Sequence, residues 1–100
     1  MKKMSLVIAG VLFTAAIGVQ ASEELYMKSG CNACHKPDVK LVGPAFKDIA
    51  EKYRGQDVAA ELTAKVKTGS PGGVFGQIPM PPSPAPEADV RVVVDWILTH

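Results

Sequence analysis

The sequence has few cysteines, few aromatic side chains and no excess of charge of either sign. Aromatic residues make up 6% of the 100 residues, and eleven Lys and Arg stand against ten Asp and Glu, for a formal net charge of +1. A near-neutral chain without a basic run gives no support to nucleic-acid binding. The two cysteines, Cys31 and Cys34, are close neighbours, so the chain is not a small fold held together by several disulfides.

Long apolar runs are also scarce, and the one that stands out lies near the N-terminus, from Leu6 to Val19. It follows a short basic start and ends at the small residue Ala21, an order that is typical of a secretory signal peptide. The run is short against the roughly 20 apolar residues that span a bilayer, which disfavours an uncleaved membrane anchor. We therefore expect residues 1–21 to be a cleaved signal peptide and residues 22–100 to be one soluble domain outside the cytoplasm.

Apolar residues recur at helical spacing along the rest of the chain, and no stretch shows the alternation of period two that strands need. Capping residues and glycines set the expected limits of the helices. The sequence therefore predicts an all-α fold. The four expected helices are one over about residues 23–30 with Ser22 as its cap, one from Pro44 to Tyr53, one capped by Asp57 and ending before Gly69, and one from Pro86 and Glu87 to Leu98.

Residues 69–85 are an exception, because glycines and prolines interrupt any helical pattern there. A loop of this length is uncommon inside a compact domain unless it has a function. Proline fixes φ, so such a loop loses less entropy when it adopts one conformation.

A domain this small also needs a stabilising element beyond its own core, such as a metal or a cofactor. The apolar residues Val74, Phe75, Ile78 and Met80 then indicate a stiff segment that covers a neighbouring group.

Residues 31–35 read Cys-Asn-Ala-Cys-His, the pattern of covalent c-type haem attachment. Two thiols at this spacing on a helical turn can each add to a vinyl group of one porphyrin, and His35 can bind the iron from one side. A redox-active dithiol of the thioredoxin kind belongs to a βαβ context, and a closed zinc site needs four ligands. We therefore expect one haem c, attached through Cys31 and Cys34.

The second axial ligand decides what the haem does, and Met27, Met80 and His100 are the candidates in residues 22–100. Met27 lies on the helix that carries the motif and is expected to fill the core. His100 is the last residue, and chain termini tend to fray. Met80 lies between prolines in a loop long enough to reach the opposite face. Ligation by His35 and Met80 would saturate the iron, which favours a one-electron carrier over a gas-binding sensor or a haem enzyme.

Four segments at these separations resemble the short bacterial monohaem class I cytochromes c, over essentially all of residues 23–100. The resemblance implies a fold of about four helices wrapped around one covalently attached haem. It also implies a periplasmic carrier, not an enzyme, that moves single electrons between respiratory complexes, for example from a cytochrome bc1-type donor to a terminal oxidase or a nitrite reductase. A monomer is expected, as the default for a mobile carrier. The segments are Cys31–His35, Val42–Ala50, Gln77–Pro82 and Asp95–Leu98.

The same resemblance implies roles for individual residues. Cys31 and Cys34 match the thioether anchors, and His35 and Met80 match the axial ligands of the iron. Pro44 matches the proline whose carbonyl accepts the N–H of the proximal imidazole, a bond that fixes the tautomer of the ligand.

Two positions depart from the family's pattern. Phe75 stands where the family often has a tryptophan whose indole N–H binds a haem propionate, so Lys65 or another base is expected to take that role. Ser83 stands where an asparagine often bonds the ligand sulfur. Trp96 matches the aromatic residue of the family's last helix, and we expect it to pack in the core.

Charge and apolar character indicate a surface for partners. Without residues 1–21, nine basic residues stand against ten acidic ones. Five lysines nonetheless lie near the motif and the next helix, where they either steer acidic partners to an exposed haem edge or are ordinary solvated lysines. We expect redox partner proteins to dock there transiently. The lysines are Lys28, Lys36, Lys40, Lys47 and Lys52, and the expected apolar patch beside them is Gly72, Gly73, Val74, Ile78 and Pro81.

Overall fold

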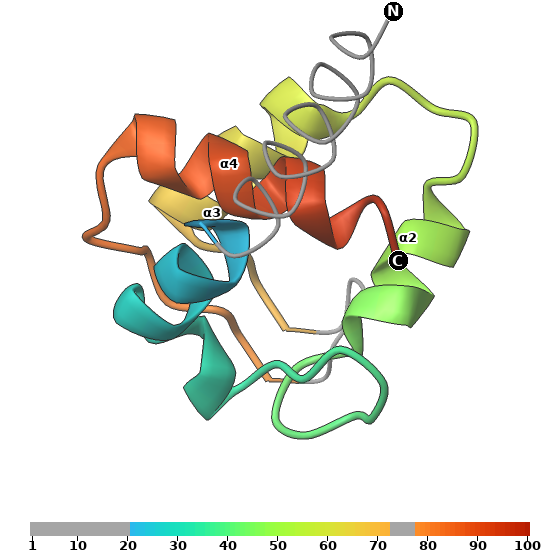
Figure 1. Ribbon diagram of the computed structural model, residues 1–100. Coiled ribbons are helices and arrows are strands. Elements are labelled where there is room, and N and C mark those ends of the chain that lie inside the picture. Colours follow the sequence, from blue (N-terminus) through green and yellow to red (C-terminus); the bar gives the residue numbers. More distant parts are fainter. Residues whose placement is uncertain (1–20, 73–77) are drawn as a thin grey trace, which may run out of the picture.

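The computed structural model of the chain describes residues 21–72 and 78–100 (Figure 1). Within these ranges every regular element is a helix, and one isolated antiparallel bridge joins Ser70 and Met80. The all-α prediction is therefore confirmed, and each of the four expected helices is present. Residues 21–28 are helical, and they are followed by the short 3-10 helix η1 (Cys31–Ala33) and the α-helices α2 (Phe46–Lys52), α3 (Ala59–Thr68) and α4 (Glu87–Ile97).

Two predictions fall on residues that lie outside the described ranges. The expected signal peptide, residues 1–21, lies almost wholly there, and so do Val74 and Phe75 of the long loop. In the described part of the chain, none of the helices combines the length and the apolar character that a bilayer crossing requires.

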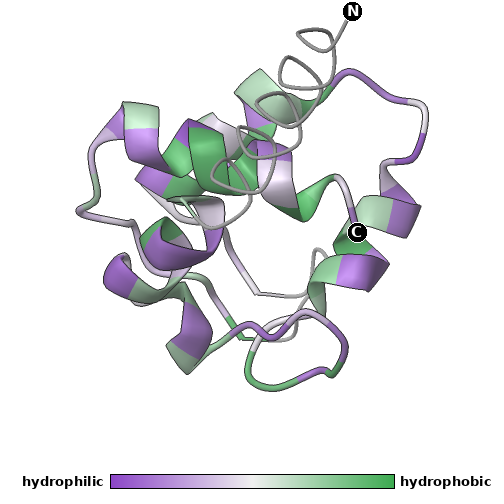
Figure 2. Ribbon diagram, in the orientation of Figure 1, coloured by the Kyte–Doolittle hydropathy of each residue, from purple (hydrophilic) through white to green (hydrophobic). Residues whose placement is uncertain are grey.

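Helix α4 is the element around which the core is built. It packs against both α3 and α2. Val90, Val93 and Val94 lie on its buried side, each at most 4% exposed. Val90 and Val94 pack with Ala59 of α3, whereas Val93 packs with Tyr26 and Phe46. Figure 2 shows hydrophobic segments alternating with hydrophilic ones along α4, as expected of a helix that buries one stripe.

Two residues predicted to cap helices do not do so. Ser22 is already helical, so its predicted role as an N-cap is wrong. Val58, not Asp57, is the N-cap of α3, and no side chain caps that end. Val58 is a core residue, and the burial of this side chain overrides the capping preference of the aspartate before it. The predicted stop of α3 is confirmed, because Gly69 follows it with a φ of +83°.

A matched pair of substitutions on α4 tests this core. Val94 is 2% exposed and Val92 is 40% exposed. We expect Val94→Ala to lower the free energy of unfolding by about 2 kcal/mol, because it removes buried methyl groups and leaves a small cavity. Val92→Ala is expected to change it by about 0.5 kcal/mol or less. Chemical denaturation followed by circular dichroism measures both, and equal losses would contradict the packing described.

Candidate haem-binding site

The cysteine motif lies at the turn that follows the first helix. Gly30, with a φ of +77°, redirects the chain into η1, and His35 N donates to Cys31 O at 2.9 Å. Cys31 and Cys34 are half-buried and are not joined to each other. Burial raises the pKa of the Cys31 thiol, whereas a redox-active cysteine needs a lowered pKa. Cys31 therefore lacks the lowered pKa that is typical of a dithiol oxidoreductase.

The imidazole of His35 is held on several sides. Its Nδ1 lies 2.8 Å from Pro44 O, and its ring stacks on Phe46 with a centroid distance of 5.5 Å. A Cβ added at Gly43 would stand 2.5 to 2.9 Å from three ring atoms. Because a carbonyl oxygen only accepts, Nδ1 carries the proton and donates it, which leaves the lone pair on Nε2. The chain thus presents a histidine in the tautomer that a metal ligand requires.

The contact between His35 Nδ1 and Pro44 O explains why α2 begins later than predicted. Pro44 was expected as the first helical residue, but α2 begins at Phe46 after Ala45, whose backbone is extended (φ −65°, ψ 148°). Phe46 N donates to Lys36 O at 3.0 Å, so the start of the helix is bonded to the segment that follows the motif. The extended backbone before it turns the carbonyl of Pro44 to His35 rather than into a helical turn.

Tyr26 is a residue of the site that the sequence analysis missed. Its hydroxyl donates to the carbonyl of His35 at 2.6 Å, and the residue is 5% exposed. Its ring contacts Phe46 at 5.2 Å and Trp96 at 5.5 Å, which confirms the expected core packing of Trp96. Burial raises the pKa of Tyr26, so its hydroxyl stays a donor. The sequence signal for Tyr26 is that it is one of few aromatic residues and lies a few positions before the cysteine motif.

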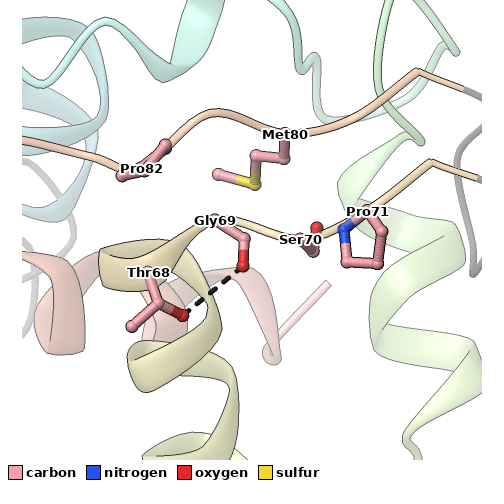
Figure 3. A pocket seen from close by; sticks show the side chains of 6 residues that line it. All are labelled: Thr68, Gly69, Ser70, Pro71, Met80 and Pro82. Atoms are coloured by element: carbon pink, nitrogen blue, oxygen red, sulfur yellow. Dashed lines mark hydrogen bonds between the residues drawn. The ribbon is translucent and has the colours of Figure 1, made fainter.

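Met80 lies in a second part of the site, built by two segments that run antiparallel. Ser70 N donates to Met80 O at 3.0 Å, and Met80 N donates to Ser70 O at 2.9 Å. Figure 3 shows the thioether of Met80 projecting between these two segments. An open hollow of about 300 Å³ lies there, and the residues that line it are Thr68, Gly69, Ser70, Pro71, Met80 and Pro82.

The two other candidate ligands are placed differently from the prediction. Met27 does not fill the core, because it is 54% exposed while the adjacent Tyr26 takes the inward position. His100 is not frayed. Its Nδ1 lies 3.0 Å from Trp96 O, and its ring packs on Trp96 at a centroid distance of 4.8 Å. Neither residue lines the hollow that includes Met80.

Of the two departures from the family pattern, Phe75 lies outside the described residues, whereas Ser83 and the proposed propionate base Lys65 have local partners. Ser83 Oγ accepts a hydrogen bond from Ala85 N at 3.2 Å, so it is engaged in its own turn. Lys65 is exposed and pairs with Glu61 at 3.6 Å. A role for Lys65 at a propionate stays a prediction.

The donors present fit a covalently bound haem. Two half-buried thiols lie in one turn, an imidazole presents a free Nε2, and a thioether lines an open hollow whose lining residues come from two other segments and not from the motif. These are the anchors and the axial ligands that a c-type haem uses.

Comparison with known proteins agrees with this chemistry. The sequence profile of the family described as Cytochrome c matches residues 19–100. The chain belongs to the cytochrome c family. Its cofactor is therefore covalent haem c, and Cys31 and Cys34 have the spacing for it.

Several relatives of this cytochrome cover most of its length. Cytochrome c-551 of Azotobacter vinelandii is 50% identical over 82 residues, which are 81% of this chain and 99% of the relative. Cytochrome c-552 of Nitrosomonas europaea is 52% identical over 82 residues, which are 80% of this chain and 79% of the relative. The crystal structure of wild-type Nitrosomonas europaea cytochrome c552 matches with a TM-score of 0.72 at 51% identity, covering 77% of this chain and 96% of that chain. The class I cytochrome c fold expected from the sequence is confirmed.

Crowding at Gly43 gives a test of the histidine's environment. In Gly43→Ala the new methyl group overlaps the His35 ring, so we expect the ring to shift and the free energy of unfolding to fall by about 1 to 3 kcal/mol. Proton NMR of the haem-loaded protein should show the Nδ1–H signal of His35 displaced or lost. In the control Gly55→Ala nothing lies within 4 Å of the added Cβ, so the unusual φ there costs stability but this signal stays in place. An unchanged Nδ1–H signal in Gly43→Ala would contradict the geometry.

Proposed function

We propose that this cytochrome is a soluble, monomeric, periplasmic one-electron carrier whose haem is attached through Cys31 and Cys34 and ligated by His35 and Met80. The observation that carries the proposal is the pair of backbone hydrogen bonds between Met80 and Ser70. These bonds fix the backbone that carries the thioether, so the iron would keep a sixth ligand rather than an open position. A saturated iron suits electron transfer and disfavours oxygen chemistry.

The residues around the haem act by positioning and tuning. The haem, when bound, supplies the one-electron couple. Pro44 accepts the Nδ1–H of His35, which raises the basicity of the ligating Nε2 and fixes the ring. Tyr26 donates to the carbonyl of the same residue, so both the side chain and the backbone of His35 are restrained. A thioether from Met80 raises the reduction potential relative to a second nitrogen ligand. Restrained ligands change little between oxidation states, which keeps electron transfer fast.

Exposed residues beside the motif support docking of redox partner proteins. Four of the five lysines, all except the half-buried Lys36, are exposed. Val39, Leu41 and Val42, in the loop that follows the motif, are 60%, 49% and 42% exposed, and Ile78 is 59% exposed. Exposed apolar side chains together with exposed lysines suit transient contact with acidic partners, such as a terminal oxidase or a nitrite reductase. Within the patch expected from the sequence, Gly73 and Val74 lie outside the described residues.

Optical spectra of the haem-loaded protein test the ligation. We expect a low-spin spectrum in both oxidation states, a weak far-red band from methionine ligation when oxidised, and no spectral shift when carbon monoxide is added to the reduced protein. Met80→Ala is expected to keep the haem attached but to lose the far-red band, to bind carbon monoxide and to have a lower potential. A high-spin wild-type spectrum, or ready carbon monoxide binding by the wild type, would favour a sensor or an enzyme instead.

Electron transfer to a small anion tests the role of the lysines. With ferricyanide as the oxidant at low salt, Lys40→Gln is expected to slow oxidation of the reduced protein by about two- to fivefold, because less positive charge steers the anion to the haem. In about 1 M salt the difference should vanish, since the screening length falls to about 3 Å. Arg91→Gln, on α4, is the charge-matched control. Equal slowing by both substitutions at low salt would contradict a steering role for the lysines near the motif.

A further inference from the structure

The segment that carries Met80 is short of hydrogen-bond donors. Between positions 79 and 86 every residue except Met80, Ser83 and Ala85 is a proline, and proline has no N–H. The segment cannot build a helix or a strand ladder of its own, so its carbonyl groups need donors from elsewhere. Its three N–H groups are all used: Met80 N donates to Ser70 O at 2.9 Å, Ser83 N to Val66 O at 2.9 Å, and Ala85 N to Ser83 Oγ at 3.2 Å.

Lys67 supplies the missing donors. Its Nζ donates to Ser83 O at 2.9 Å and also to Ala85 O. The residue is half-buried, unlike the neighbouring Lys65, which is exposed and pairs with Glu61. Hydrogen bonds from a charged group are stronger than neutral ones, and partial burial reduces their screening by water. A cation in the last turn of α3 is also favoured by the helix dipole.

These bonds anchor the segment at Met80 and directly after it. The antiparallel bridge ties the backbone of Met80 itself to Ser70, and three residues later Ser83 is tied to Val66 and Lys67. All these anchors lie at the C-terminal end of α3 or directly after it, as Figure 3 shows for residues 68–71. Gly69 permits the close approach, because a Cβ there would stand 2.8 Å from Met80 O.

We propose that Lys67 is a positioning residue for the sixth ligand: its ammonium group holds the carbonyl groups of Ser83 and Ala85 against α3 and so keeps the Met80 thioether on the iron. This rests on the ligation by Met80 proposed above. Lys67 does not touch the haem in this proposal. It sets how readily the Met80 segment opens while the rest of the fold stays intact.

Displacement of Met80 by imidazole measures that opening. In the oxidised, haem-loaded protein imidazole competes for the sixth position, and loss of the far-red band reports its binding. Lys67→Met keeps the length of the side chain but removes every donor, so imidazole should bind about tenfold more tightly or better, the change expected from losing charge-assisted hydrogen bonds. Lys67→Arg keeps charge and donors and should stay within about threefold of the wild type. Arg54→Gln, which removes an exposed cation, should not change the affinity.

A second readout separates positioning from general stability. If Lys67→Met lowers the free energy of unfolding but leaves the imidazole affinity within twofold of the wild type, Lys67 only stabilises the fold and the proposal is wrong. If the wild type itself lacks the far-red band, Met80 is not the sixth ligand. The proposed function then fails, which is distinct from a failure of the role of Lys67 alone.

Chemical modification keeps the test valid if Lys67→Met does not fold. Acetic anhydride is applied to the wild-type haem-loaded protein, and modified lysines are quantified by mass spectrometry. Lys67 is expected to react at least fivefold more slowly than exposed Lys40 and Lys47, because two carbonyl groups occupy its N–H groups. Equal reactivity would overturn the proposal.

Discussion

The hydrogen bond from His35 Nδ1 to Pro44 O is the constraint on which the rest of the site depends. It fixes the tautomer of the imidazole and keeps Pro44 and Ala45 out of α2, so the helix starts at Phe46. The ring of Phe46, at this helix start, stacks on the His35 ring. One residue before the proline, Gly43 leaves room for the ring to lie this close. A single contact across nine residues of chain thus sets the tautomer of the imidazole, the turn and the helix start together.

Local chemistry was enough to predict the helices and the haem cofactor. Glycines at Gly55 and Gly69 mark helix ends because only glycine takes their positive φ readily. The cysteine motif needs no tertiary information, since its spacing alone matches a porphyrin. Pattern reasoning failed where a long-range contact outweighed a local preference. Asp57 lost its expected capping role to the burial of Val58.

The residues missed by the sequence analysis act on backbone carbonyl groups that the sequence does not reveal. Tyr26 donates to the carbonyl of His35, and Lys67 donates to those of Ser83 and Ala85. Such partners depend on how two segments meet, which periodicity and spacing do not encode. His100 was mistaken for a free end for the same reason, since its packing on Trp96 exists only once α4 is in place. A side chain that donates hydrogen bonds to remote carbonyl groups therefore cannot be identified from the sequence before the fold is known.

The two sides of the site are held by different means. The His35 side is tied to the core, because Tyr26, Phe46 and Trp96 pack against one another behind it. The Met80 side is a proline-rich segment held to the end of α3 by a few hydrogen bonds. Local opening follows the regions with the fewest buried apolar contacts, so the Met80 side should open first while His35 stays in place. In the carrier proposed above, such an opening would release the Met80 thioether from the iron while the haem stays attached through Cys31 and Cys34.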